Sequence, residues 1–277
     1  VQAFHAVLDN AGLSTKDAII PDGRLHRFRV NGDKPGSKNG WYVLYGDDLS
    51  AGAFGCWRRG IAETWSAKPD RTMTATERAE FARRMDEARK ARQNEAERRH
   101  RDAQHKALAI WKDMPPALDD HPYLIKKRVH SHGLRLYKGA LVIPMRDSAG
   151  SLHSLQFIDG DGNKRFLSGG RKKGCYFAIG TPADTVCICE GYATGASIHE
   201  ATGHAVAVAF DAGNLLSVAQ ALRSKFPDVK IILCADNDAQ TPGNPGLSKA
   251  REAAAFIGAL LAVPPCAGDF NDLMTGG

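Results

Sequence analysis

The most constraining feature of the sequence is a regular alternation of short apolar runs and helical segments that begins near residue 185. Thr185 to Cys189, His204 to Phe210 and Lys230 to Ala235 are rich in Val, Ile, Ala and Cys, which is typical of strands buried on both faces. Segments with helical spacing separate them, and Leu261 to Pro264 supplies a short fourth run. This alternation predicts βαβ units and a parallel sheet.

Acidic residues follow these runs where the expected strands end. Glu190 comes directly after the first run, Asp236 and Asp238 follow the third, and Asp269 lies in the turn after the fourth. The carboxyl ends of parallel strands share one edge of a sheet, where open α/β sheets bind ligands. Carboxylates gathered there repel one another unless a cation such as Mg²⁺ holds them, which favours phosphoryl or nucleotidyl chemistry. The alternative is that Asp236 and Asp238 are ordinary turn residues, with Asn237 between them in a left-handed conformation.

These acidic motifs resemble those of the Toprim domain that bacterial replicative primases, topoisomerases and some nucleases share. The string EGYAT, which starts at Glu190, is similar to the signature of primases carried by conjugative plasmids and satellite phages. The resemblance implies metal-dependent primer synthesis, with Glu190, Asp236 and Asp238 as catalytic, metal-binding residues and Asp269 as a further metal-side carboxylate. It leaves open whether Glu190 is a metal ligand or a general base.

Two positions depart from the pattern of the replicative primases. Thr194 stands four residues after Glu190, where those primases usually have Asp. The late turn reads Asp269-Phe270-Asn271 in place of Asp-x-Asp, and Asp272 follows one place later. We therefore expect the second metal site to be leaner or differently built.

The resemblance extends upstream to the segments HPYLIKKRV, ALVIPMRDSAGSLHSLQFI and GNKRFLSGGRKKGCYF, which look like the small basic subdomain that precedes Toprim in primases. In the last segment, Gly169 and Gly170 are expected to let the backbone approach a ligand. The basic loop after them is interpreted as a triphosphate clamp, with the template backbone or a solvated face as alternatives. The residues predicted to bind nucleotide or template are Lys164, Arg165, Arg171, Lys172, Lys173, Asp211, Asn214 and Arg146.

Charge is divided unequally along the chain. Residues 1–183 contain 32 Lys and Arg against 21 Asp and Glu, whereas residues 184–277 contain 5 against 10. The overall charge of +6 thus hides a basic front part that suits a nucleic-acid backbone.

The N-terminal part carries glycine turns between aromatic and basic residues, which predicts a small domain of short antiparallel strands. Its aromatic residues, beside Arg58 and Arg59, could stack unpaired bases or simply form the core. Cys56 stands alone where a zinc site needs four Cys or His ligands, so no structural zinc is expected. The stretch between Pro69 and Pro115 predicts one long charged connector helix that starts at a capping box, Thr74 to Glu77.

The predicted fold class is α/β. A Toprim-type parallel sheet flanked by helices (184–277) is preceded by a small basic mixed α+β subdomain (115–183), the long charged helix (69–114) and a small β-rich domain (1–68). Six cysteines without the spacing of a disulfide framework, no apolar stretch of membrane-spanning length and no signal sequence favour a cytoplasmic protein. A first residue Val and an end shortly after the last motif suggest a domain cut from a longer polypeptide.

The function predicted is a DNA-dependent RNA primase of a plasmid, phage or other mobile element, dependent on Mg²⁺ or Mn²⁺. Its expected partners are a single-stranded DNA template, ribonucleoside triphosphates and a replicative helicase or a helicase module of the same polypeptide, with no membrane. The alternatives are a Toprim-type nuclease and a non-catalytic single-strand-binding module that loads a helicase. A topoisomerase is disfavoured, because nothing resembles its nucleophile-tyrosine domain.

Overall fold

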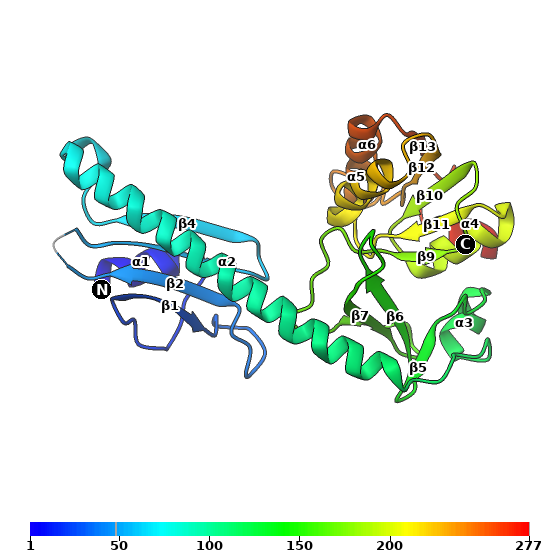
Figure 1. Cartoon of the computed structure of the whole chain (residues 1–277), viewed down its shortest axis with the longest axis horizontal. Coiled ribbons are helices and arrows are strands. Elements are labelled where there is room, and N and C mark those ends of the chain that lie inside the picture. The colour runs from blue at the N-terminus through cyan, green and yellow to red at the C-terminus, as the bar shows by residue number, and fades with distance from the viewer. Residues whose placement is uncertain (48, 277) are drawn as a thin grey trace. The chain divides into compact units, whose positions relative to one another are not determined.

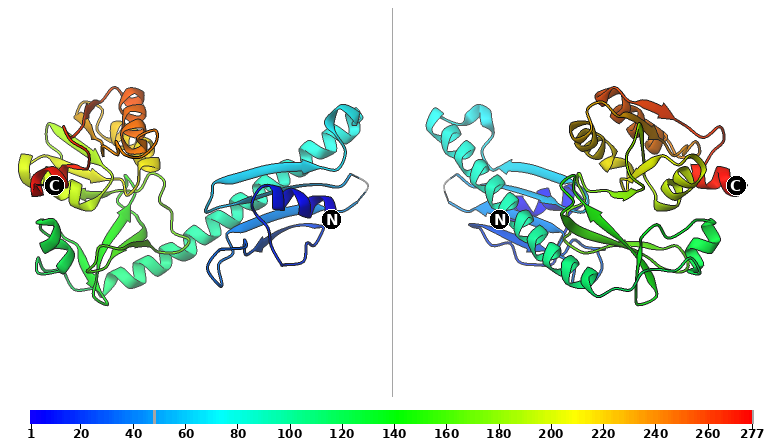
Figure 2. Two further views of the ribbon diagram at one scale, coloured as in Figure 1. Left: turned by 180° about the vertical axis from the view of Figure 1, so that it is seen from behind. Right: turned by 45° about the vertical axis from the view of Figure 1, so that its right-hand side comes forward.

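The computed structural model describes residues 1–47 and 49–276 (Figures 1 and 2). They form two compact units, Val1–Arg98 (unit 1) and Arg99–Gly277 (unit 2), and the long helix α2, Ala75–Lys112, contributes to both. The finer division at residues 68, 114 and 183 stays a prediction. None of the described helices combines the length and the apolar character that crossing a membrane requires.

Unit 1 contains an antiparallel sheet whose four strands follow chain order, as the sequence predicts for short strands between glycine turns. Helix α1, Gln2–Asn10, packs on one face through Phe4 and Leu8, where Tyr42, Phe54 and Cys56 are also buried. Trp41 and Val43 lie on the other face and pack against α2. The strands are β1 (Asp22–Phe28), β2 (Gly40–Tyr45), β3 (Ala51–Cys56) and β4 (Ile61–Ser66).

Helix α2 follows a 3₁₀ turn, η1 (Asp70–Thr72), and begins at the predicted capping box. The Thr74 N–H donates to Glu77 Oε2 at 2.7 Å, and the Glu77 N–H donates to Thr74 Oγ1 at 3.2 Å. The helix is more than a solvated connector, because Ala88 is 1% exposed in unit 1 and Ala107 is fully buried in unit 2. Its charged surface hides a narrow stripe of small and apolar residues that packs on sheets.

Unit 2 begins with an antiparallel sheet in the order β5-β6-β7-β8. One face packs Val142 and Phe157 against the last turns of α2, and the other face contributes Leu141 and Ile158 to a second core. Successive residues along each strand point to opposite faces, so both faces of this sheet carry buried apolar side chains. The elements are α3 (Pro122–Lys127), β5 (Arg135–Tyr137), β6 (Ala140–Arg146), β7 (Leu152–Ile158) and β8 (Lys164–Phe166).

The second sheet of unit 2 has the order β13-β12-β10-β11-β9. The pairs β10–β11, β10–β12 and β12–β13 are parallel, and only β9 is antiparallel, which confirms the predicted parallel sheet flanked by helices. Helices α5 and α6 cover one face, and α4 covers the other (Figure 1). The elements are β9 (Phe177–Ile179), β10 (Thr185–Cys189), α4 (Tyr192–Thr202), β11 (Ala205–Val208), η2 (Ala212–Asn214), α5 (Leu215–Lys225), β12 (Lys230–Cys234), α6 (Pro245–Ile257), β13 (Leu260–Ala262) and α7 (Phe270–Thr275).

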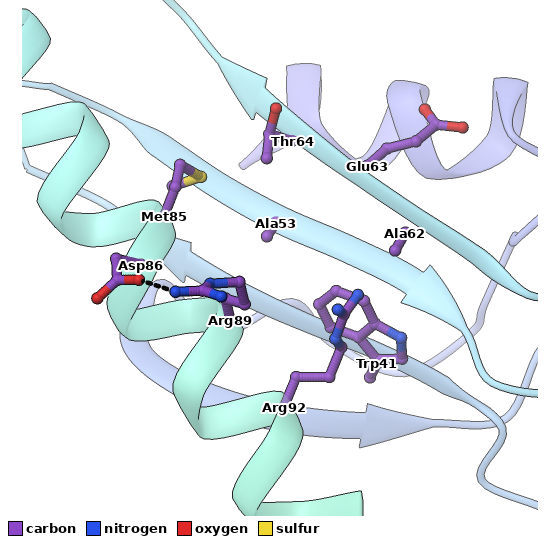
Figure 3. A pocket seen from close by; sticks show the side chains of 9 residues that line it. All are labelled: Trp41, Ala53, Ala62, Glu63, Thr64, Met85, Asp86, Arg89 and Arg92. Atoms are coloured by element: carbon purple, nitrogen blue, oxygen red, sulfur yellow. Dashed lines mark hydrogen bonds and ion pairs between the residues drawn. The ribbon is translucent and has the colours of Figure 1, made fainter. Parts of the chain in front are cut away.

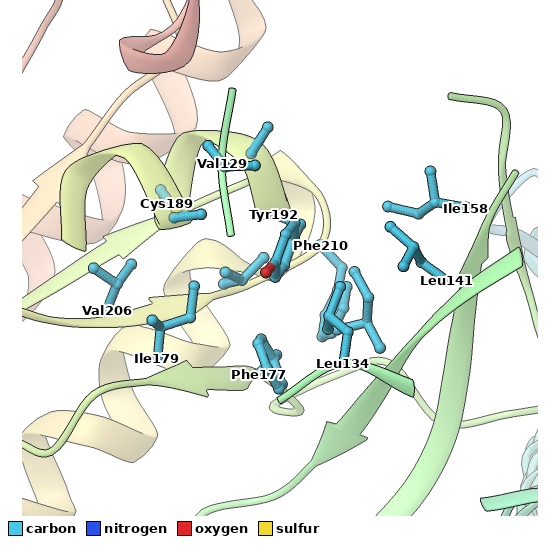
Figure 4. Close-up of a cluster of buried hydrophobic side chains, with 14 of the residues drawn as sticks. Val129, Leu134, Leu141, Ile158, Phe177, Ile179, Cys189, Tyr192, Val206 and Phe210 are labelled. Carbon is cyan, nitrogen blue, oxygen red and sulfur yellow. The ribbon is translucent and has the colours of Figure 1, made fainter. Parts of the chain in front are cut away.

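One hydrophobic core joins the two sheets of unit 2 (Figure 4). Tyr192 and Phe210 from the parallel sheet side pack in the same cluster as Leu141 and Ile158 from the antiparallel sheet. The Tyr192 side chain is buried, and its hydroxyl donates a hydrogen bond to the backbone oxygen of His130 at 2.7 Å. This shared core fixes the position of the basic strands relative to the ends of the parallel strands, where the acidic residues lie.

Candidate active site

The acidic residues singled out in the sequence gather at the carboxyl edge of the parallel sheet. Strands β10 and β12 are neighbours with Ile188 opposite Leu233, so Glu190 and Asp236 leave adjacent strands at nearly the same level. Glu190, Asp236 and Asp269 line one cavity of about 160 Å³, together with Lys164 of β8 and Thr194 of α4; Tyr123, Lys127, Gly191, Ala193 and Phe210 complete its lining.

Two of these carboxylates each have one oxygen that is buried without a hydrogen-bond partner. Glu190 Oε1 and Asp236 Oδ1 are both inaccessible and unpaired. Burial, followed by the charges of Asp236 and Asp238, raises the pKa of Glu190 to about 7. Burial, followed by the charges of Asp269 and Asp238, raises the pKa of Asp236 to about 7, and Lys164 opposes this shift. The fold thus holds these carboxyls where their ionised forms lack stabilisation.

Gly246, in the first turn of α6, lies beside the side chains of Glu190 and Asp238. A Cβ atom at this position would lie 2.9 Å from Asp238 Oδ2, 3.0 Å from the Asp236 backbone oxygen and 3.1 Å from Glu190 Oε1. Three oxygens from two strand ends therefore surround one small volume that only glycine leaves open.

The loop after β12 is held in one conformation by its own polar groups. Asn237 exchanges two backbone hydrogen bonds with Gly268, and Asn244, with φ of 41°, accepts from the Asp238 N–H at 2.9 Å. The left-handed residue of this loop is Asn244, whereas the ordinary-turn alternative expects it to be Asn237. These hydrogen bonds to Gly268 and Asn244 hold the loop, so Asp236 and Asp238 are oriented more firmly than they would be in a solvated turn.

The donor set fits a hard cation. Carboxylate and backbone oxygens with unpaired buried atoms are the groups that Mg²⁺ or Mn²⁺ would stabilise. Across residues 1–47 and 49–276, no three His, Cys, Asp or Glu side chains lie close enough to hold one ion by themselves. Water and substrate oxygens would have to complete the coordination, which is usual for Mg²⁺. The metal role of Glu190, Asp236, Asp238 and Asp269 stays a prediction.

Comparison with known proteins bears on this site. Residues 185–276 match the family described as the Toprim domain. Residues 185–276 form a Toprim domain. The chain is also 37% identical over 265 residues to a DNA primase TraC of Escherichia coli, and 34% identical over 292 residues to a second one. These alignments cover 88% and 95% of this chain, which spans only 24% and 19% of those relatives.

A solved structure of the primase fragment of the bacteriophage T7 primase-helicase protein aligns with this chain at a TM-score of 0.41 and 17% identity. The alignment covers 55% of this chain and 69% of that one.

Asp269 caps the N-terminus of α7 in the Toprim domain. Its Oδ1 accepts from the backbone N–H groups of Asn271 and Asp272, and the Asp272 side chain accepts from the Asp269 N–H, which completes a capping box. Its Oδ2 accepts from the Thr194 hydroxyl at 3.0 Å. Thr194, which stands where the replicative primases usually have Asp, thus supplies a donor that orients Asp269. The leaner second metal site stays a prediction.

Of the predicted basic residues, only Lys164 lines the cavity of the Toprim domain. Arg165 belongs to the other face of β8, where its guanidinium lies 4.5 Å from the ring centre of Phe157. Arg146 donates to the backbone oxygen of Gly150 in the β6–β7 turn.

The loop that contains Arg171, Lys172 and Lys173 is partly neutralised. Arg171 pairs with Asp147 at 3.2 Å, and Lys172 pairs with Asp211 at 2.6 Å, while Lys173 is exposed. The triphosphate role of this loop stays a prediction, and a nucleotide would have to compete with two ion pairs.

The two glycines before this loop each have a structural role within the protein. A Cβ at Gly170 would overlap Ser154 Oγ, and Gly169 has a φ of 81° with Arg99 O near its missing Cβ. Packing against Ser154 therefore accounts for Gly170, and the positive φ accounts for Gly169, while close approach of a ligand to this backbone stays a prediction.

Asn214 joins the same loop to the Toprim domain. Its Oδ1 accepts from the Gly174 N–H at 2.8 Å, and its Nδ2 donates to the backbone oxygens of Cys175 and Ala209 at 2.9 Å each. The side chain is only 4% exposed. The predicted contact between Asn214 and a nucleotide stays a prediction, and the three hydrogen bonds of its side-chain amide all go to backbone groups of the protein.

We expect Asn214→Ala to lower the free energy of unfolding by about 2–4 kcal/mol, because it leaves three buried backbone groups unpaired. Denaturant unfolding measures the change, and Asn163→Ala, which removes an exposed amide, serves as the control. Unchanged stability together with a higher KM for ribonucleotides would instead establish Asn214 as a nucleotide contact.

Lys127 and Tyr123 of α3 line the cavity but were not identified from the sequence. Lys127 pairs with Asp272 at 3.4 Å, and its backbone oxygen accepts from the buried amide of Asn271 at 2.7 Å. Both residues lie in the quoted HPYLIKKRV segment, more than 60 positions before Glu190. No local spacing could have placed them beside the carboxylates.

Proposed function

We propose that this chain is the catalytic part of a DNA-dependent RNA primase that acts on single-stranded DNA. One observation carries the proposal: Glu190 and Asp236 each have a buried, unpaired carboxylate oxygen, and both residues line a cavity that also receives Lys164, at the strand ends of a Toprim domain. The similarity to proteins named DNA primase TraC supports the choice of primase among Toprim activities.

The residues have distinct tasks in this proposal. Glu190, Asp236 and Asp238 would hold Mg²⁺ or Mn²⁺, with Asp269 beside them. Such ions lower the pKa of an attacking hydroxyl and stabilise a leaving pyrophosphate. Lys164 and Lys127 contribute fixed positive charges on the cavity wall, where they would attract the phosphates of a ribonucleoside triphosphate. Whether Glu190 holds the ion or accepts the proton of the attacking 3′-hydroxyl is left open.

The partners and the setting belong to the same proposal. We infer a single-stranded DNA template and ribonucleoside triphosphates as substrates, a replicative helicase or a helicase module of the same polypeptide as partner, and replication of a plasmid, phage or other mobile element in the cytoplasm as context. The net charge of residues 99–183, with 15 Lys and Arg against 7 Asp and Glu, supports a contact with nucleic-acid backbone.

The decisive experiment incubates the chain with single-stranded DNA, labelled ribonucleotides and Mg²⁺ or Mn²⁺. We expect short RNA products that disappear when EDTA removes the ion. Shortened DNA in place of RNA would indicate a nuclease, and neither product would favour a binding module.

The EDTA experiment also addresses unit 1. We expect circular dichroism of the chelated protein to stay native, because no structural zinc is expected near Cys56, which is buried in an apolar core. Stoichiometric zinc in the purified protein, or unfolding of unit 1 on chelation, would contradict this expectation.

A further inference from the structure

Unit 1 carries a groove that the catalytic proposal does not use. It lies between the first part of α2 and the edge strand β4, and it encloses about 390 Å³ (Figure 3). Trp41 and Ala53 lie at its floor, and Met85, Arg89 and Arg92 form its wall on the helix side.

The floor is flat because small residues share one face of β3 and β4. Ala53 pairs with Thr64, and Gly55 pairs with Ala62, so these four positions lie on the face that α2 only partly covers. A Cβ at Gly55 would lie 2.9 Å from Cζ2 of Trp41, which shows that the indole lies across the glycine. Ala62 and Thr64 are exposed. These small residues therefore form a flat apolar surface, the shelf, beside the indole of Trp41.

The helix side of the groove is cationic. The Arg92 guanidinium lies 5.2 Å from the ring centre of Trp41, and no carboxylate among the described residues forms an ion pair with it. Arg89 is 65% exposed and pairs with Asp86, which also accepts from Lys90.

Glu63 also contributes to the lining of the groove, but no ion pair joins it to Arg89 or Arg92. Strand alternation places its side chain on the opposite face from Ala62 and Thr64, and Figure 3 shows it turned away from Arg89 and Arg92. Asp86, which also lines the groove, is paired with Arg89, so Arg92 is the cation over the apolar floor that has no ion pair with a carboxylate of residues 1–47 and 49–276.

We propose that this groove binds unpaired nucleotides of a single-stranded nucleic acid. A guanidinium that stacks on an aromatic ring can receive a base on its other side, and Arg89 can contact a phosphate at the rim. An acidic peptide could match the charge, but it makes no use of a flat floor with a stacked indole and guanidinium. The choice of a nucleic acid rests in part on the proposed function, and it places a second contact with the strand outside the Toprim domain.

The first test measures the affinity of the whole chain for a fluorescently labelled oligothymidylate across a salt series, without nucleotides or divalent ions. We expect the double variant Arg89→Gln, Arg92→Gln to raise Kd about fivefold or more, the effect of losing one stacked base. The slope of log affinity against log salt should fall by about 0.7 for each lost phosphate contact. Thr64→Glu, on the exposed shelf, should weaken binding as well, and it leaves the Arg92–Trp41 stack intact.

Arg83→Gln is the matched control, because Arg83 is an exposed arginine of the same helix that pairs with Glu80 and Glu87 and does not line the groove. Affinity and slope equal to wild type in both groove variants would overturn the inference. Tighter binding of an oligoglutamate peptide than of DNA, lost in the same variants, would also overturn it and assign the groove to a protein.

The second test uses an oligonucleotide with 5-iodouracil, irradiated in complex with the chain and mapped by mass spectrometry. We expect crosslinks to the peptides that contain Trp41 or Met85, and crosslinks to unit 2 alone would contradict the inference. The outcome is separable from the primer assay, because a chain that makes no primers can still show groove-dependent binding. A chain that makes primers but binds DNA independently of the groove would refute this inference alone.

Discussion

Asp236→Asn should abolish primer synthesis and, at the same time, make the metal-free protein more stable. Activity should fall at least about 100-fold, since changing even the groups that support a metal ligand costs 10- to 100-fold. The stability gain has a separate cause. Asp236 Oδ1 is buried and unpaired, and burial with the charges of Asp269 and Asp238 raises the carboxyl's pKa to about 7.

The pH dependence follows from that shift. Because the folded pKa is raised above the unfolded value, the wild-type carboxyl is tolerated while it is protonated and destabilises the fold as pH rises towards 7. In EDTA at pH 8, Asp236→Asn should raise the free energy of unfolding by about 2–4 kcal/mol, and the gain should shrink towards pH 4.

Denaturant unfolding and the primer assay on the same preparations measure both effects. Adding Mg²⁺ or Mn²⁺ should stabilise the wild type more than the variant. Asp228→Asn, which removes an exposed acid on the chain segment before β12, is the control for a general charge effect. Primer yield equal to wild type would refute the metal assignment, and lower stability of the metal-free variant would refute the electrostatic account.

Gly246→Ala should have the second largest effect, although it adds only one methyl group. The new Cβ would lie 2.9 Å from Asp238 Oδ2 and 3.1 Å from Glu190 Oε1, so at least one carboxylate must move. Misplacing a reacting group by about 1 Å can cost 100-fold in rate, and we expect a loss of that order in primer synthesis.

Helix propensity predicts that the same substitution does not lower the free energy of unfolding. A loss of activity can therefore be separated from a loss of stability. Alanine is favoured over glycine within a helix by up to about 1 kcal/mol, so the metal-free protein should not be severely destabilised. Ser248→Ala raises helix propensity on the exposed side of α6 and should leave activity unchanged. Full activity of Gly246→Ala would show that the space beside Glu190 and Asp238 is not used in catalysis.

The sequence alone predicted the class of the fold and the location of the acidic residues. The apolar runs at Thr185–Cys189 and Lys230–Cys234 are strands because a two-sided buried strand must be continuously apolar, and their parallel pairing follows from the helices between them. The capping box at Thr74 is likewise a local pattern whose two hydrogen bonds need no distant partner.

Only the tertiary structure decided which polar residues meet the carboxylates. Lys127 and Lys164 reach the cavity from α3 and β8, whereas Arg165, one position after Lys164, belongs to the opposite face of the strand. Asn214 is used by three backbone groups, and Gly170 makes room for Ser154. Local periodicity determines which face a residue occupies, but the packing of one sheet on another determines what that face meets. Contacts across long separations in the chain leave no signal in the spacing of residues.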